Sequence, residues 1–293
     1  MTLRLSHSFT FLEKIWFIYS QRIHKALIND NANFYLKPND IISHRPTLFG
    51  YHELLIETFI DQASAEHSDF FLDLGANIGL TSSMVGNGFQ RIDCVEPNEL
   101  VFNILKTNLA LNIASDNYHC HMIGLGKQDE TLKLLIPKDN FGGAFIKENN
   151  NIAIKRESEL SNDYLEVQVE IVNSHDWLKK FFWELKESNQ KKGIIKVDVE
   201  GYEEIIFDRL IATLPKDFDV IVIMENWFEH FPTNKYKSDN HDLAWYYFKK
   251  KKRWLHSIPF KFLGLSSSYQ HELVELTETT KNPHDIVCQI SAK

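Results

Sequence analysis

The segment FFLDLGANIGLTSS, residues 70–83, combines an apolar run, an acid and two glycines in a spacing that suits ligand binding. The apolar residues predict a strand that is buried on both faces and ends near Asp73. Gly75 and Gly79 allow a tight turn or a close approach of the backbone to a ligand, because glycine has no Cβ. We therefore expect the loop between this strand and the following helix to hold a ligand.

The glycine spacing argues against two well-known phosphate-binding loops. The dinucleotide fingerprint G-x-G-x-x-G needs a third glycine, but Ala76, Asn77 and Ile78 separate the only two glycines of this loop. A P-loop needs a Gly-Lys-Ser/Thr step, which does not follow. A ligand with an adenosine body and an amino-acid tail fits better, with Asp73 as the carboxylate near a cationic tail.

Glu96 is the second acid with an informative position. It lies 21 residues after Gly75, at the end of the strand-like run RIDCVEP. In α/β nucleotide-binding folds, an acid at this place accepts hydrogen bonds from the ribose hydroxyls. Such charge-assisted bonds stabilise a complex by about 1.5–3 kcal/mol each. The spacing favours Glu96 as a ribose ligand over the alternative of a solvated acid at a strand end.

The elements that must position these residues alternate along the chain. From residue 69 onward, strand-like runs alternate with helix-like segments, which predicts a parallel sheet covered on both faces. The predicted strands are DFFLDL, RIDCVEP, YHCHMIGLG with TLKLLIP as its hairpin partner, GIIKVDVEG, DVIVIMEN, and a terminal pair, FKFLGLS and HDIVCQI. Residues 137–170 interrupt the alternation, and we expect them to extend over the sheet end where α/β folds bind ligands.

The sequence divides into two predicted regions. Residues 1–68 form an N-terminal helical segment, in which the spacing of Phe9, Leu12 and Trp16 predicts a helix docked on its own domain. Residues 69–293 form the α/β domain, with an insertion near 137–170.

Composition narrows the class of partners. The net charge is −8, so no overall field attracts the chain to nucleic acid or to an anionic membrane. The three cysteines are far apart and form no CxxC pair. His119 and His121 share a strand face, but no third ligand lies nearby in sequence. We therefore predict no metal site. No stretch approaches 18 uninterrupted apolar residues, and we predict a cytoplasmic protein.

Four segments together give the chain a specific resemblance: FLDLGANIGLTSS, CVEPN, LKTNLALN and IIKVDVEGYEEIIF. In this order they resemble the FkbM family of S-adenosylmethionine-dependent methyltransferases, over roughly Gly50 to Asn226, including GYHE at residues 50–53. The resemblance implies a class I methyltransferase fold: an α/β, Rossmann-like, mostly parallel sheet with an antiparallel C-terminal strand. It also implies S-adenosylmethionine as cofactor and O-methylation of hydroxyl groups on sugars or natural products.

The resemblance also implies a set of cofactor-binding residues. Asp73 and the loop after it would line the methionine end, Glu96 would hold the ribose with Asn98 beside it, and Gly124 would lie near the adenine. The full set is Glu53, Asp73, Gly75, Ala76, Asn77, Gly79, Glu96, Asn98, Gly124 and Asp198.

Methyl transfer to a hydroxyl needs a group that removes the hydroxyl proton, and a positioned carboxylate or histidine contributes about 10²–10⁴-fold to the rate. In KVDVEGYE, Asp198 and Glu200 lie two residues apart, so on an extended strand they share a face, with a helix beginning near Gly201. Asp198 is the first candidate for the catalytic base, followed by Glu225 and His230. The alternative is that Asp198 and Glu200 cap the following helix.

These interpretations favour an O-methyltransferase that acts on a hydroxyl of a saccharide or glycoconjugate. O-methylation of a non-sugar secondary metabolite and a non-catalytic, S-adenosylmethionine-binding regulatory module stay open as alternatives. Nucleic acid is a disfavoured partner, because the chain is acidic and has neither an Asn/Asp-Pro-Pro-aromatic step nor a Pro-Cys nucleophile. The acceptor and the oligomeric state do not follow from the sequence.

Residues 243–260 form a basic, aromatic run, although the chain as a whole is acidic. Aromatic residues at 245–248 and Trp254 flank five cations, Lys249 to Arg253. In one interpretation, residues 245–254 make a weak contact with a membrane surface or a lipid-linked substrate, through stacking on sugars and pairing with phosphates. The favoured interpretation is a helix that packs its apolar face on the sheet and exposes its basic end.

Overall fold

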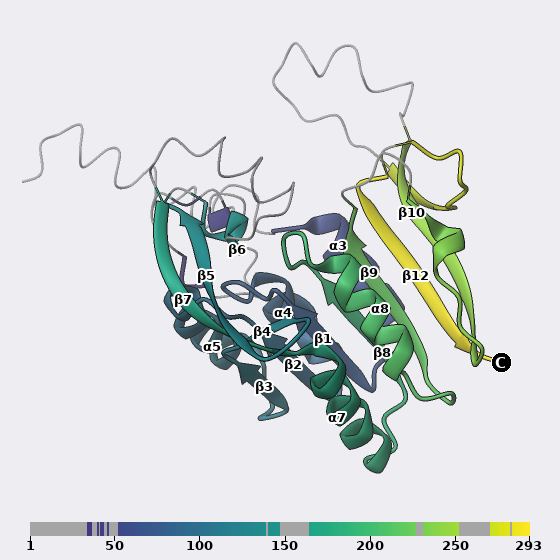
Figure 1. Ribbon diagram of the computed structural model, residues 1–293, viewed down its shortest axis with the longest axis horizontal. Helices are drawn as coiled ribbons and strands as arrows, with labels where there is room; N and C mark the ends of the chain where they lie inside the picture. Colours follow the sequence, from purple (N-terminus) through teal and green to yellow (C-terminus); the bar gives the residue numbers. More distant parts are fainter. Residues whose placement is uncertain are drawn as a thin grey trace, which may run out of the picture.

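The computed structural model describes residues 34–36, 40, 42–43, 46, 52–138, 140–146, 164–226, 231–251, 270–281 and 283–293. Within these residues the strands form two sheets (Figure 1). The main sheet contains β1 (Phe70–Leu74), β2 (Arg91–Val95), β3 (Tyr118–His121), β8 (Lys192–Val197), β9 (Asp219–Glu225), β10 (His241–Lys251), β11 (Gln270–Glu275) and β12 (Asp285–Ala292). The second sheet contains β4 (Gly124–Gly126), β5 (Glu130–Pro137), β6 (Phe145–Ile146) and β7 (Tyr164–Asn173).

The strand order of the main sheet is β3-β2-β1-β8-β9-β12-β10-β11. β1 pairs in parallel with β2 and β8, and β8 pairs in parallel with β9, so the carboxyl ends of these strands meet at one edge. β12 is antiparallel to both of its neighbours, β9 and β10. The sheet is therefore mostly parallel with an antiparallel C-terminal strand, which confirms the predicted fold class.

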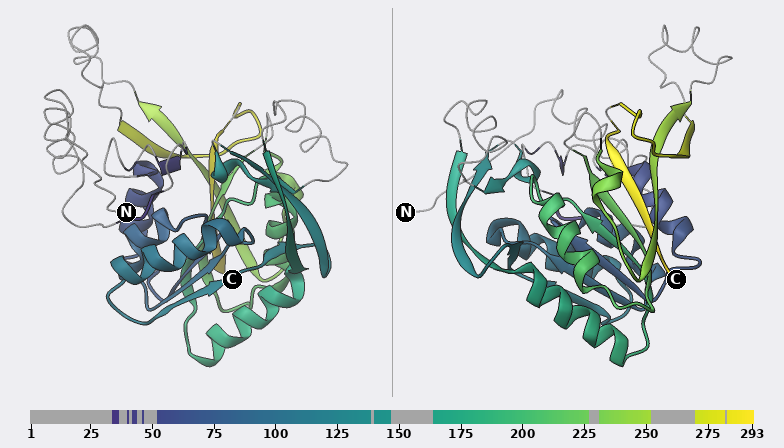
Figure 2. Two further views of the ribbon diagram at one scale, coloured as in Figure 1. Left: turned by 90° about the vertical axis from the view of Figure 1, so that its left-hand side faces the viewer. Right: turned by 45° about the vertical axis from the view of Figure 1, so that its right-hand side comes forward.

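Helices cover both faces of the main sheet (Figure 2). One face carries α3 (Leu54–Ala63), α4 (Leu80–Val85) and α5 (Glu99–Asn112), and the other carries α7 (Ser174–Glu187) and α8 (Glu203–Thr213). Three short 3-10 turns, η1 (Gly86–Gly88), η2 (Phe141–Gly143) and η3 (Thr233–Lys235), join these elements. All five residues of β1 are buried, as expected for a strand between two helical layers.

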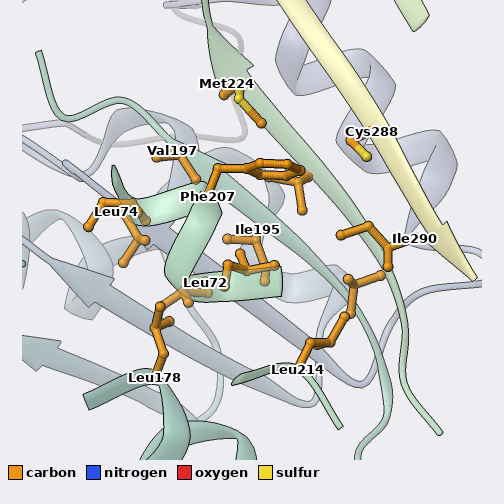
Figure 3. Close-up of a cluster of buried hydrophobic side chains, with 14 of the residues drawn as sticks. Leu72, Leu74, Leu178, Ile195, Val197, Phe207, Leu214, Met224, Cys288 and Ile290 are labelled. Carbon is orange, nitrogen blue, oxygen red and sulfur yellow. The ribbon is translucent and has the colours of Figure 1, made fainter. Parts of the chain in front are cut away.

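The larger hydrophobic core lies between the sheet and helices α7 and α8. Leu72 and Leu74 of β1 pack there with Val197 of β8, Leu178 of α7 and Phe207 of α8 (Figure 3). Fully burying one such side chain stabilises the fold by about 1.5–3 kcal/mol. This packing fixes the ends of the central strands, from which the loops of the candidate site extend.

The predicted strand YHCHMIGLG is not one strand. Its first part forms β3 in the main sheet, and its last part forms β4, which pairs with β7 in the second sheet. The predicted hairpin between this segment and TLKLLIP is also wrong, because β5 pairs with β7. The apolar side chains of β5, Leu134 and Ile136, are buried against Val169 and Ile171 of β7, and this long-range packing decides the pairing.

The favoured helix in the basic, aromatic run is wrong as well. Residues His241–Lys251 form strand β10, paired with β11 and β12. Trp245 is buried against Phe207 and Phe231, and Phe248 contacts Phe59 of α3. Trp245 is therefore a core residue whose ring is not available for stacking on a sugar.

Several predictions fall on residues outside the described part of the chain. These are the N-terminal helix around Phe9, Leu12 and Trp16, the strand FKFLGLS, the candidate base His230, and the end of the basic run from Lys252 onward. None of the helices in the described part of the chain has the length and apolar character needed to cross a membrane.

Candidate functional site

A cavity of about 440 Å³ lies at the carboxyl ends of β1, β2, β8 and β9, and the second sheet forms one of its walls. In open α/β sheets this edge is where ligands bind. The cavity brings together nine of the predicted site residues: Glu53, Asp73, Gly75, Ala76, Asn77, Glu96, Gly124, Asp198 and Glu225. Its size is within the range of about 300–1,000 Å³ that is typical of small-molecule sites.

Gly75 is required where the ends of β1 and β8 touch. Its φ is +83°, and a Cβ at this position would lie 1.8 Å from the carbonyl oxygen of Asp198. The backbone N–H of Asp198 donates to the carbonyl of Leu74 at 2.9 Å, and that of Gly75 donates to Val95 at 2.9 Å. A side chain at Gly75 would push apart the strand ends that shape the cavity.

Gly79 and Asn98 do not line the cavity. Gly79 precedes α4 with a φ of +75°. Asn98 caps α5 by accepting the N–H of Leu100 through Oδ1 at 3.1 Å, and its own N–H donates to Oε1 of Glu96 at 2.8 Å. Each residue is hydrogen-bonded to a residue that does line the cavity, because the N–H of Gly79 donates to the carbonyl of Ala76 at 2.8 Å and that of Asn98 donates to Glu96. Their assignment as cofactor ligands stays a prediction.

Glu96 is held by the backbone on both of its oxygens. Oε2 accepts the N–H of Asn77 at 2.9 Å and Oε1 accepts that of Asn98, while only 7% of the residue is exposed. Each carboxylate oxygen keeps a second lone pair that can accept a hydroxyl. Burial raises the pKa of Glu96 to about 7, although its two backbone hydrogen bonds act in the opposite direction.

Lys196 is a cavity residue that sequence reasoning missed. Its Nζ lies 2.8 Å from Oδ2 of Asp198 and 3.9 Å from Oδ1 of Asp73, and only 8% of the residue is exposed. Burial lowers the pKa of Lys196, but the charges of Asp198, Asp73 and Glu53 together raise it above its usual value. Lys196 therefore stays protonated and fixes the carboxylate of Asp198.

Asp73 is buried and paired within the protein. Ser82 donates to Oδ2, while Oδ1 faces Lys196 and accepts no hydrogen bond from the described residues. Burial raises the pKa of Asp73, and the charge of Lys196 opposes this effect. Oδ1 of Asn77 is likewise buried with no hydrogen-bond partner among the described residues. These two oxygens leave acceptor capacity for N–H or O–H donors of a ligand.

The segment after β8 does not continue as an extended strand. β8 ends at Val197, Glu200 has a φ of +52°, and α8 begins at Glu203 rather than near Gly201. The reason is Glu203, whose buried carboxylate accepts the N–H of Val199 at 3.1 Å and of Gly201 at 2.9 Å. The predicted shared strand face is therefore wrong, and Glu203 satisfies the N–H groups that precede α8.

Glu225 ends β9, as the sequence predicts. It lies near two residues that the sequence did not indicate, His284 just before β12 and Asp285 at its start. Nε2 of His284 lies 3.8 Å from Oε1 of Glu225, and Nδ1 lies 3.2 Å from Oδ1 of Asp285. All three residues line the cavity. Burial and then the charge of Asp198 raise the pKa of Glu225 to about 7, and His284 lowers it.

His121 belongs to a buried ion-pair network. Its Nε2 lies 2.8 Å from Asp93, which also accepts a hydrogen bond from Arg91 at 2.7 Å. Burial raises the pKa of Asp93, but these two partners outweigh it and lower the pKa overall. Within the described ranges, no group of three or more His, Cys, Asp or Glu side chains could hold a metal ion.

Sequence comparison identifies the family to which the chain is related. The family model described as "Methyltransferase FkbM domain" matches residues 73–260. Methyltransferase sdnD from Sordaria araneosa is 28% identical over 176 residues, which cover 55% of this chain and 68% of that protein. Methyltransferase 1 from Beauveria bassiana is 26% identical over 191 residues, which cover 62% of this chain and 73% of that protein.

Comparison with solved structures finds matches of low similarity. A SAM-dependent methyltransferase from Agrobacterium tumefaciens superposes with a TM-score of 0.40 at 8% identity, over 82% of this chain and 62% of that chain. The family assignment follows from the sequence match, which spans more than half of the chain and contains the glycine loop, Glu96, Asp198 and Glu225. The chain belongs to the FkbM family of methyltransferases, and its cofactor is S-adenosylmethionine.

Proposed function

We propose that the chain is an O-methyltransferase that acts on a hydroxyl group of a saccharide or glycoconjugate. The observation that carries this proposal is the cluster of carboxylates in the cavity, formed by Glu53, Asp198, Glu200, Glu225 and Asp285. Ionised carboxylates only accept hydrogen bonds, and a polyhydroxylated acceptor offers several donors close together. The chemistry of the cavity therefore matches a sugar better than an apolar metabolite.

The residues at the other end of the cavity fit the cofactor. In this proposal Glu96 accepts the ribose hydroxyls, and Gly75 and Asn77 let the backbone approach the ligand. The oxygens of Asp73 and Asn77 that have no hydrogen-bond partner among the described residues meet donors at the methionine end. Gly124, next to β7, lies beside the adenine. S-adenosylmethionine, when bound, supplies a methyl group activated by a positively charged sulfonium.

Of the candidate bases, we assign proton removal to Glu225. An efficient general base has a pKa near the working pH, and the pKa of Glu225 is about 7. Asp198 is tied to Lys196 at 2.8 Å, so its charge is already partly compensated by a fixed cation. We therefore give Asp198 the role of orienting the acceptor hydroxyl, and Glu225 that of taking its proton.

The pH dependence of binding tests the role of Glu96. The ionised carboxylate is the better hydroxyl acceptor, and its pKa is about 7, so affinity rises as the proton is lost. We expect S-adenosylhomocysteine, the demethylated product, to bind about tenfold more tightly at pH 8 than at pH 6, measured by isothermal titration calorimetry. The Glu96→Gln variant should bind more weakly and show little pH dependence. An equally steep dependence in that variant would contradict the assignment.

An acceptor panel tests the proposed function. The protein is incubated with methyl-labelled S-adenosylmethionine and with free sugars, nucleotide sugars, glycosides, phenols, amines and RNA, and the products are identified by mass spectrometry. We expect a methyl group on a sugar hydroxyl. Transfer only to phenols, amines or RNA would overturn the saccharide assignment, and binding of S-adenosylhomocysteine without any transfer would favour the non-catalytic module. The exclusion of nucleic acid stays a prediction until this test.

A further inference from the structure

Residues that precede the family match pack on the glycine loop. Phe34, Leu36 and Ile42 contact a small apolar cluster that contains Ile78 and Leu80, at the start of α4. Phe141 of the turn η2 packs against the same cluster and also against the apolar cluster of the second sheet. Two segments that are distant in sequence thus converge on the loop that follows β1.

Asn108 of α5 fixes the first of these segments. This residue is fully buried, and its side chain accepts the N–H of Tyr35 at 2.7 Å and donates to the carbonyl of Tyr35 at 3.1 Å. The same amide donates to the carbonyl of Ile78 at 2.7 Å. One side chain therefore joins the N-terminal residues directly to the backbone of the glycine loop.

Asp40 joins the N-terminal residues to η2. Only 2% of Asp40 is exposed, and its Oδ1 accepts the backbone N–H of Phe141 at 2.8 Å, across 101 positions of sequence. Its Oδ2 accepts both the N–H and the hydroxyl of Ser43 at 3.1 Å. A carboxylate is costly to bury unless it is hydrogen-bonded, so these contacts account for its place here.

The joined segments form part of the cavity wall at its cofactor end. Ile42, Phe141 and Gly142 line the cavity, and a Cβ on Gly142 would lie 2.7 Å from Ile42 and 2.8 Å from the side-chain nitrogen of Asn77. Asn77 in turn donates its N–H to Glu96, the predicted ribose ligand. The turn η2 therefore contacts Asn77, the residue whose N–H holds Glu96 in place.

We propose that Asp40 is a positioning residue that holds η2 against the glycine loop and thereby retains the cofactor and its demethylated product in the cavity. Residues 40–43 lie outside the family match at 73–260, so this part of the site belongs to the chain's own N-terminal segment. The inference requires that the cofactor binds beside Asn77, but it does not depend on which acceptor is methylated.

The test measures binding of S-adenosylhomocysteine alone, by surface plasmon resonance on the immobilised full chain. Asp40→Ala removes the acceptor for the Phe141 N–H, and we expect the dissociation rate constant to rise about tenfold. Asp40→Asn keeps one oxygen that can accept this N–H and should restore much of the slow dissociation. Ser43→Ala is the matched control, because it removes a partner of the same carboxylate without touching η2, and its rate constant should stay within about twofold of the parent.

Two results would overturn the proposal. One is an unchanged dissociation rate constant in both Asp40 variants. The other is an equally large increase in Ser43→Ala, which would show that loss of N-terminal structure in general, and not the bond to Phe141, accelerates release. Thermal unfolding of the ligand-free variants separates the two effects, because a positioning role predicts faster release in Asp40→Ala than in the parent and in Asp40→Asn, even where the melting temperatures agree.

Discussion

Replacing Glu225 by Gln is expected to lower the turnover number by about a hundredfold or more, while the affinity for S-adenosylhomocysteine changes by less than about threefold. The substitution keeps the size of the side chain and removes its ability to take a proton, and a lost general base typically costs 10²–10⁴-fold. The turnover number is measured at saturating concentrations of both substrates, with the acceptor that the panel identifies, and the affinity is measured by calorimetry.

The pH profile of the same reaction gives a second measure of this role. A base must be deprotonated to act, so the turnover number of the parent should rise with pH through about 7, the pKa of Glu225. Burial and the charges of Asp198, Glu203 and Asp285 raise this pKa, and the charge of His284 lowers it. His284→Gln should therefore move the rise to higher pH, and Glu225→Gln should abolish it.

Asp198→Asn is the comparison that separates the two carboxylates. If Asp198 only orients the acceptor, this variant should raise the KM of the acceptor and keep the rise in turnover number near pH 7. Full activity in Glu225→Gln, together with loss of turnover and of the pH-dependent rise in Asp198→Asn, would transfer the role of the base to Asp198.

Gly75→Ala is expected to abolish detectable binding of S-adenosylhomocysteine and to lower the free energy of unfolding by at least about 2 kcal/mol. The left-handed backbone conformation at φ +83° costs a residue with a Cβ about 1–2 kcal/mol. The added methyl would also lie 1.8 Å from the carbonyl oxygen of Asp198, and relieving such an overlap costs about 1–3 kcal/mol. Relief requires the ends of β1 and β8 to separate, which deforms the cavity.

Gly88→Ala is the matched control for this prediction. Its Cβ would lie 3.1 Å from the hydroxyl oxygen of Ser64, a half-buried side chain that needs to shift by only a few tenths of an ångström to accommodate it. Chemical denaturation and calorimetry should find this variant close to the parent in stability and in affinity. A Gly75→Ala protein that binds as tightly as the parent would show that the close contact between β1 and β8 does not shape the site.

The sequence by itself determined the central strands, the glycine loop and nine of the residues that line the cavity. Consecutive apolar residues predict a buried strand such as β1. The positions of Gly75 and Glu96 can be predicted because their spacing is fixed within one strand–helix–strand unit. Glu225 could be predicted as a strand end for the same reason. These features depend on neighbours within about 25 residues, so a local pattern contains the information.

The tertiary structure decided the features that depend on contacts between distant segments. Three local predictions were wrong, because local propensity competes there with long-range packing. The structure instead pairs β5 with β7, forms a strand at residues 241–251 and turns after Val197. Lys196, His284 and Asp40 gave no local signal of function. A charged residue acquires a defined role when folding brings a partner within about 4 Å, and for these residues that occurs between strands or segments that the sequence alone does not align. Lys196 and Asp40 are also buried, which strengthens their interactions, whereas His284 stays exposed beside Glu225.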